Sequence, residues 1–205
     1  MDLRLRIYGD PILSAKAERI TQATNELKDL SARMIDIMRS SNGIGLAGPQ
    51  VGVSRRIIVL ELAMPGPDKD GNLPVISPGE ALLIPRMPLG MINPVITSTN
   101  TKTLEAEEGC LSVPEFYASL TRPTEVDIRF QAFDGEMLSV HCGGWLARAL
   151  QHEIDHLNGI LFVDKLSKEM LRAHKPKLEK IKKQGSQKGF FNRFFTNGHT
   201  KEELF

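Results

Sequence analysis

The chain contains two histidines and a glutamate at the spacing His152-Glu153-x-x-His156. Residues four apart share one face of a helix, so both imidazoles can bind the same transition-metal ion. Glu153 is close enough to act on a water bound to that ion, and the pattern therefore indicates metal-assisted hydrolysis. Histidines at this spacing also occur without a metal, and at this stage both interpretations stay open.

A catalytic metal site of this kind needs a third protein ligand and an open position for water. Cys110 is the candidate, since it lies in the small-residue turn Glu108-Gly109-Cys110-Leu111-Ser112. An inert, buried thiol is the alternative for Cys110, and it is the stronger expectation for Cys142, which lies inside an alternating strand. Two cysteines cannot form a disulfide framework.

The two histidines must be carried by a helix, and the run from Trp145 to Leu157 contains no Gly or Pro. Further helices are predicted over 25–40, from an apolar stripe, and over 166–184, where Pro176 should kink or split the helix. Strands are predicted over 1–7, 56–62, 91–97, 116–120, 126–133 and 137–142. Because the strands do not alternate with helices, the expected class is α+β, with antiparallel or mixed strands packed around a central metal-binding helix, and with a C-terminal helix.

Two stretches are predicted to be irregular. Residues 43–52 are rich in small residues, cannot form a regular helix or strand, and let backbone approach a ligand closely. A phosphate-binding loop is the alternative there, but no Lys-Ser/Thr follows and the preceding element is a helix. Residues 64–88 contain six prolines and are predicted to be an inserted loop with one strand at 81–84, of open function.

Composition is that of a globular protein, with 41% hydrophobic and 25% charged residues among 205. No apolar run approaches a membrane span, and the N-terminus lacks the pattern of a signal peptide, so a cytoplasmic protein is expected. Residues 165–193 hold ten lysines and arginines against two acidic residues, a net charge of +8, which leaves −7 for the remainder. The basic segment suggests a local anionic partner.

Three stretches occur together and in order: Gly43-x-Gly45-Leu46-Ala47-x-x-Gln50, Glu108-Gly109-Cys110-Leu111-Ser112 and Gln151-His152-Glu153-x-Asp155-His156. This set resembles the three signature motifs of the peptide deformylases, and the resemblance covers about residues 1–170. Gly48 stands where the family usually has Ala, a small-for-small change. The resemblance implies hydrolysis of the N-formyl group from the N-formylmethionine of nascent proteins, with release of formate.

The resemblance also implies roles for individual residues. Cys110, His152 and His156 would bind Fe2+, with Zn2+ or Ni2+ possible in purified protein, and Glu153 would be the general base and then the general acid. The amide of Gln50 and the backbone N–H of Leu111 would stabilise the oxyanion. The methionine pocket would be lined by Ile44, Gly45, Trp145, Ala149 and Arg148.

For Trp145, a core anchor is the alternative to a pocket wall. Glu108 would support the site, paired with Arg122, against the alternative of an ordinary surface ion pair. The basic helix resembles the segment that bacterial deformylases dock on the ribosome, with a solvated lysine-rich face as the alternative. The expected division is a catalytic domain (1–165), the basic helix (166–184) and a tail (185–205) that is either mobile or a short aromatic-rich appendage, with no membrane or DNA partner.

Two other functions use the same residues. A zincin-type metallopeptidase would cleave internal peptide bonds, but it would take a His or Glu downstream of the pair as third ligand, and His174 lies beyond the helix. An RNA-docking protein with a structural metal would need a fourth ligand, and the sequence offers none at a suitable spacing.

Overall fold

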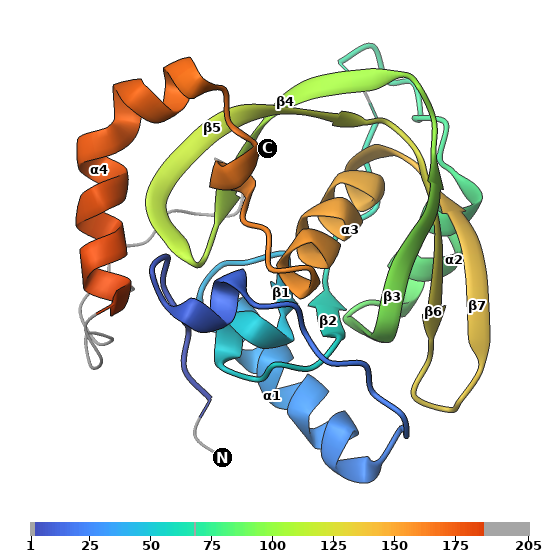
Figure 1. Ribbon diagram of the computed structural model, residues 1–205. Helices are drawn as coiled ribbons and strands as arrows, with labels where there is room; N and C mark the ends of the chain where they lie inside the picture. Colours follow the sequence, from blue (N-terminus) through green and yellow to red (C-terminus); the bar gives the residue numbers. More distant parts are fainter. Residues whose placement is uncertain (1–2, 68, 187–205) are drawn as a thin grey trace.

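Seven strands and four α-helices form the part of the chain that the computed structural model describes, residues 3–67 and 69–186 (Figure 1). The helices are α1 (Asn25–Ser40), α2 (Pro78–Leu83), α3 (Gly144–Leu157) and α4 (Lys168–Ser186). The strands are β1 (Gly45–Ala47), β2 (Ile57–Leu60), β3 (Leu89–Thr99), β4 (Thr103–Cys110), β5 (Val113–Pro123), β6 (Val126–Gln131) and β7 (Met137–Cys142). The predicted α+β class is confirmed. Within the described ranges, no helix is long and apolar enough to cross a membrane.

The strands form two antiparallel sheets, one of five strands in the order β1-β2-β3-β6-β7 and one consisting of β4 and β5. The turn at Asp134-Gly135 joins β6 to β7, as the sequence predicts, and Gly135 adopts the positive φ that such a turn requires. Helix α3 lies between the two sheets (Figure 1). A side chain on α3 can therefore reach either sheet.

Helix α3 is amphipathic, and its apolar side packs into the core formed with the larger sheet. Leu146, Leu150 and Leu157 are fully buried there, together with residues of the sheet such as Ile58 and Phe130. Cys142 is also buried in this cluster, and burial raises the pKa of its thiol to about 12. The expected burial of Cys142 is confirmed.

Helix α4 packs against the rest of the molecule through Leu178 and Ile181, which share a buried cluster with Phe116 of β5 and Phe162. Pro176 does not split the helix, but the axis of α4 changes direction along its length (Figure 1), as the alternative of a kink predicts. The apolar contacts of Leu178 and Ile181 hold the next turn in place despite the missing N–H of proline. Most of the predicted tail, residues 187–205, lies outside the described residues.

Two predictions for the first fifty residues are wrong in part. Residues 3–7 form no strand, although Leu3, Leu5 and Ile7 are buried on one side as the alternation indicates. The backbone of this segment makes isolated hydrogen bonds, such as Arg6 N–H to the Gln50 carbonyl at 2.7 Å, and its apolar side chains pack in the core. The stretch 43–52 is not wholly irregular, because β1 pairs with β2 and a short 3₁₀ helix, Gly48–Val51, follows it.

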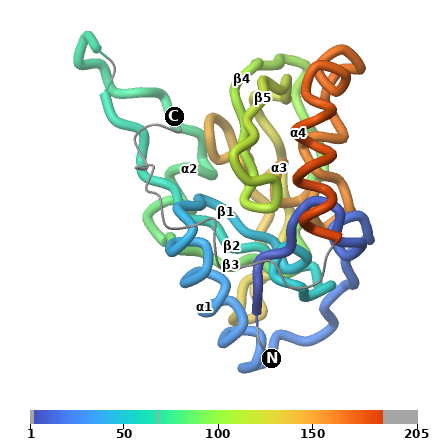
Figure 2. Tube along the Cα trace, turned by 90° about the vertical axis from the view of Figure 1, so that its left-hand side faces the viewer, coloured from blue at the N-terminus to red at the C-terminus, as the bar shows by residue number. Residues whose placement is uncertain are grey.

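Two further corrections concern the middle of the chain. The predicted strand at 81–84 belongs to helix α2 and the 3₁₀ turn after it, because Ser77 and Glu80 form a capping box and Pro78 occupies the first helical position. The segment between β2 and α2 extends away from the rest of the molecule (Figure 2). Strand β4 was not predicted, since its largely exposed, acidic sequence lacks an apolar alternation and is held by cross-strand pairing with β5.

Candidate metal centre and active site

Cys110, His152 and His156 come together in space although Cys110 is more than forty residues from the histidines in sequence. Cys110 lies at the end of β4, and both histidines lie on the side of α3 that faces it. Their ligand atoms all lie within 4.8 Å of one another, and Cys110 Sγ is 3.2 Å from His156 Nε2. One thiolate and two imidazoles form a donor set that fits a single divalent transition metal with an open position. The three residues that the sequence predicted as ligands therefore lie together in the structure.

The ring of His152 is oriented by Glu108. His152 Nδ1 lies 3.0 Å from Glu108 Oε2, and because an ionised carboxylate only accepts, Nδ1 carries the proton of this hydrogen bond. The other ring nitrogen, Nε2, is then the atom that faces the ligand cluster. A carboxylate behind a ligating histidine fixes the tautomer and raises the basicity of the ligand.

Burial and neighbouring charges shift the pKa values of these groups in different directions. Burial opposes the charged form of Glu108, but hydrogen bonds from His152 and Arg122 outweigh it and hold the pKa of Glu108 well below its ordinary range. Burial would lower the pKa of His152, but hydrogen bonds to Cys110 and Glu108 raise it to about 10. Burial, and then the positive charge of His152, lower the pKa of His156. A metal binding at His152 must therefore displace a proton.

Glu153 is buried beside the ligand cluster, and one of its carboxylate oxygens, Oε2, has no hydrogen-bond partner within the described part of the chain. Burial raises its pKa to about 7, which suits a group that accepts and returns a proton near neutrality. Gly45 makes room for it, because a Cβ at Gly45 would lie 2.3 Å from Glu153 Oε1. An unpartnered buried carboxylate oxygen at this place fits a role toward a water or a substrate.

The side-chain amide of Gln50 is held in one orientation. Its Oε1 accepts a hydrogen bond from the backbone N–H of Ala47 at 2.7 Å, so its NH2 group must point the other way. That group lies 3.5 Å from Cys110 Sγ and 3.3 Å from Ser112 Oγ. Gln50 thus presents fixed N–H donors to the edge of the ligand cluster.

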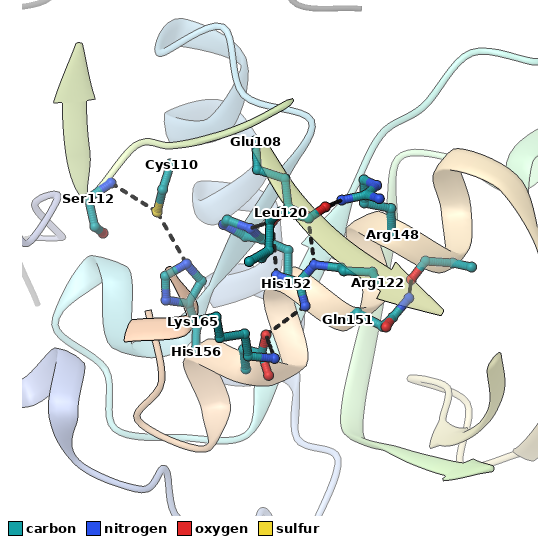
Figure 3. A network of polar contacts seen from close by, with 12 residues as sticks. Glu108, Cys110, Ser112, Leu120, Arg122, Arg148, Gln151, His152, His156 and Lys165 are labelled. Carbon is teal, nitrogen blue, oxygen red and sulfur yellow. Dashed lines mark hydrogen bonds and ion pairs between the residues drawn. The ribbon is translucent and has the colours of Figure 1, made fainter. Parts of the chain in front are cut away.

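A chain of buried ion pairs extends from His152 toward the surface (Figure 3). Arg122 binds both oxygens of Glu108, with Nε to Oε1 at 2.6 Å and Nη2 to Oε2 at 2.9 Å. Its third nitrogen, Nη1, donates to Asp155 at 2.8 Å, and Lys165 lies 2.5 Å from the same Asp155 oxygen. The predicted pairing of Glu108 with Arg122 is confirmed. The alternative of a surface ion pair is wrong, since both side chains are at most 5% exposed.

Comparison with known proteins places the chain in a family. The sequence profile of polypeptide deformylase matches residues 3–172. The chain belongs to the polypeptide deformylase family. It is 35% identical to the peptide deformylase of Thermosynechococcus vestitus over 175 residues, which covers 85% of this chain and 84% of that protein. It is 37% identical to the Thermotoga maritima deformylase over 164 residues, covering 80% and 87% of the two chains.

Solved deformylase structures have the same fold. The peptide deformylase of Plasmodium falciparum matches with a TM-score of 0.74 at 33% identity, covering 87% of this chain and 94% of that one. The Thermus thermophilus enzyme matches with a TM-score of 0.72 at 32% identity, covering 88% and 98%. Membership of this family makes the chain a metal-dependent hydrolase, and it sets aside both the zincin-type peptidase and the non-enzymatic RNA-docking protein.

The residues that the family resemblance assigns to the methionine pocket differ in their surroundings. Gly45 and Ala149 are buried and Ile44 is partly buried. Trp145 is 41% exposed, so it is not the core anchor that was the alternative for it. Arg148 is buried, and its guanidinium is bound to Glu108 and to two backbone carbonyls. The charged end of Arg148 is therefore held by Glu108 and by the backbone of β4 and β5.

Three residues of the site received no role from the sequence. Ser112 accepts from Gln50 and points its backbone N–H at Cys110 Sγ, at 3.4 Å. Asp155 and Lys165 form the outer end of the ion-pair chain. Ser112 and Asp155 lie inside the quoted motifs, which was the available signal. No local pattern indicates Lys165, because its pairing with Asp155 depends on the turn after α3.

Proposed function

We propose that this deformylase works with Cys110, His152 and His156 as the ligands of one divalent metal and with Glu153 as its proton-transfer group. The reaction is the hydrolysis of the N-formyl group of the N-formylmethionine that begins a nascent protein, with release of formate. The observation that carries the assignment is the meeting of three ligand atoms within 4.8 Å beside a buried carboxylate with an unpartnered oxygen.

When bound, the metal supplies a nucleophilic water at neutral pH and polarises the formyl carbonyl. Glu153 accepts the proton that the water loses as it attacks the formyl carbon. The same carboxyl group then delivers this proton to the amide nitrogen, the C–N bond breaks, and formate and the free amine of methionine leave. A pKa of about 7 lets Glu153 perform both transfers near neutrality.

Charge develops on the formyl oxygen during the attack, and this charge needs fixed donors. Gln50 is suited to the task because its amide oxygen is already bound to Ala47 and its NH2 group faces the site. The backbone N–H of Leu111, in the turn between β4 and β5, is the second donor that we assign. Donors that are oriented before the reaction avoid reorganisation as the charge appears.

We assign the methionine side chain to a slot between Ile44 and Gly45 on one wall and Trp145 and Ala149 of α3 on the other. The exposed face of Trp145 is compatible with contact to a ligand. The peptide that follows the methionine would pair alongside Gly45, where β1 offers backbone groups at the edge of the five-stranded sheet.

We propose Fe2+ as the metal in the cell, with Zn2+ or Ni2+ as possible occupants after purification. Thiolate and imidazole ligands are compatible with all three ions, and availability in the cell decides between them. Metal analysis of protein purified without oxygen, together with formate release per metal, tests the assignment. Iron as the ion that correlates with activity is the expected result, and activity that follows zinc alone would contradict it.

The substitution Glu153→Gln tests the mechanism. The variant should retain its metal and lose formate release from N-formyl-Met-Ala, because glutamine cannot carry the proton. Glu80→Gln is a matched control, since Glu80 is another buried carboxylate, and its Oε2 accepts hydrogen bonds from Ser77 at the start of α2, outside the ligand cluster. Formate release that persists in Glu153→Gln would show that Glu153 is not the proton-transfer group. Cleavage of an unformylated peptide would point to peptidase activity.

We propose that α4 contacts ribosomal RNA through its outer face, as a unit distinct in function from the catalytic domain 1–165. Its exposed basic residues include Arg172, Lys180 and Lys183, which face away from the buried Leu178 and Ile181. Changing these three residues to glutamate should abolish ribosome co-sedimentation at low salt while formate release continues. Unchanged co-sedimentation would refute the contact. This proposal places the enzyme in the cytoplasm, where nascent chains emerge and the Cys110 thiol stays reduced.

A further inference from the structure

The three ligands of the proposed metal site come from two elements that are far apart along the chain, so only tertiary contacts can hold them together. Cys110 lies at the end of β4, in the two-stranded sheet, whereas His152 and His156 lie on α3. The site keeps its geometry only while the β4–β5 hairpin stays at a fixed position against α3. Given the proposed function, we propose that Arg148 is a positioning residue that holds this hairpin, and with it Cys110, against the metal-binding helix.

Arg148 stands on α3, one turn before His152, and its guanidinium reaches both strands of the hairpin (Figure 3). It donates to the backbone carbonyl of Leu104 in β4 at 2.6 Å and to that of Leu120 in β5 at 3.0 Å. It also donates to Glu108 Oε1 at 2.5 Å. Two of these three acceptors are main-chain atoms, so Arg148 holds the backbone of the hairpin as well as a side chain. The residue is only 7% exposed, so water cannot readily replace these bonds.

The same side chain completes the surroundings of Glu108. An ionised carboxylate has about four acceptor positions, and here Arg122 fills two of them, while Arg148 and His152 fill one each. Arg148 shares Oε1 with Arg122, which leaves Oε2 to Arg122 and the His152 ring. Arg148 therefore connects the position of β4 with the orientation of a metal ligand through a single buried carboxylate.

The geometry also explains why arginine, and not lysine, serves here. A guanidinium is a rigid planar fork that can bind several acceptors at once, whereas an ammonium is a compact point charge. The three acceptors are a backbone carbonyl of β4, a backbone carbonyl of β5 and the Glu108 carboxylate, so a group that reaches only one of them would lose the connection from α3 to part of the hairpin. A contribution of Arg148 to the methionine pocket, the expectation from the family resemblance, would need a different part of this side chain.

Cobalt-loaded, full-length protein tests the proposal, since a thiolate bound to Co2+ has a charge-transfer absorption band that reports on Cys110. In Arg148→Met, Co2+ should be released into excess chelator about 10–100-fold faster than from the wild type, with a weakened or shifted thiolate band. Arg148→Lys should release Co2+ at a rate between those of the wild type and Arg148→Met. It is the variant to measure if Arg148→Met does not fold. Asn100→Ala is the matched control, because Asn100 also makes three side-chain hydrogen bonds, none of them to α3. It should release Co2+ at the wild-type rate.

Three results would overturn the proposal. The first is release of Co2+ from both Arg148 variants at the wild-type rate with an unchanged thiolate band. The second is that same unchanged release together with an altered preference between formyl-Met-Ala and formyl-norleucyl-Ala, which would place Arg148 in the pocket. The third is a wild-type protein that binds Co2+ without any thiolate band, which would also remove Cys110 from the proposed metal site. The test does not depend on deformylase activity, because Co2+ release and the thiolate absorption band are measured independently of turnover.

Discussion

Replacing Glu108 by glutamine tests the buried charge network behind the metal ligands. The substitution keeps the shape of the side chain and removes its charge, which leaves the guanidinium groups of Arg122 and Arg148 without their shared counter-ion. Both arginine side chains are at most 8% exposed. Breaking a buried ion pair by removing one partner typically costs about 3–5 kcal/mol, because the remaining charge is poorly solvated. For a protein of this size that cost corresponds to a fall in Tm of roughly 6–20 °C.

The pH dependence of this loss has a definite sign. The pKa of Glu108 in the folded protein lies well below its ordinary value of 4.5, so its contribution to stability is present above pH 4.5. It is lost as the pH falls below 4.5 toward the lower pKa of the folded state. The difference in unfolding free energy between wild type and Glu108→Gln should therefore be largest near neutrality and should shrink in acid.

Urea unfolding of the metal-free proteins, followed by circular dichroism, measures the effect, since a bound metal would add its own stabilisation. Glu61→Gln is the matched control, because Glu61 also forms a two-point ion pair, with Arg39, but in a more exposed position. That variant should lose less than about 1 kcal/mol. If Glu108→Gln loses no more stability than Glu61→Gln, then the buried network does not stabilise the fold.

Three further predictions concern the reacting groups. Burial raises the pKa of Glu153 from 4.5 to about 7, so the metal-free protein should lose about 3 kcal/mol of stability as the pH rises through this range. Urea unfolding at a series of pH values measures this loss, and Glu153→Gln should abolish it. Gln50→Ala should lower kcat about 10²–10³-fold with unchanged metal content, and a loss below tenfold would remove Gln50 from the oxyanion donors. Gly45→Ala would place a Cβ 2.3 Å from Glu153 Oε1, so kcat should fall about 100-fold while the metal is retained; full activity would show that Glu153 can shift without loss.

The residues to which we assign the chemistry could be named from the sequence. His152, Glu153 and His156 lie within one helical turn, so local geometry alone brings them together. Gln50 and Cys110 lie in turns rich in small residues, where the composition itself indicates a close approach of backbone to a ligand. The α+β class followed in the same way, from strands that cluster around one amphipathic helix.

Elements whose stability comes from distant partners were not predictable in the same way. Strand β4 has no apolar periodicity of its own and exists because β5 pairs with it along its length. The first residues alternate like a strand, yet the structure offers them only isolated backbone bonds. Helix α2, by contrast, was predictable from the sequence, since Ser77, Pro78 and Glu80 together form a local signal for the start of a helix.

Sequence by itself determined which atoms can bind a metal and move a proton, because residue type and helical spacing are local properties. Only the tertiary structure decided how those atoms are supported. Arg148 illustrates the difference, since the family resemblance assigned it to the pocket wall, and only the structure shows that its guanidinium binds Glu108, Leu104 and Leu120 on the facing hairpin. The physical reason is that a buried charge must find its partners wherever the chain brings them, and those partners lie far away in sequence.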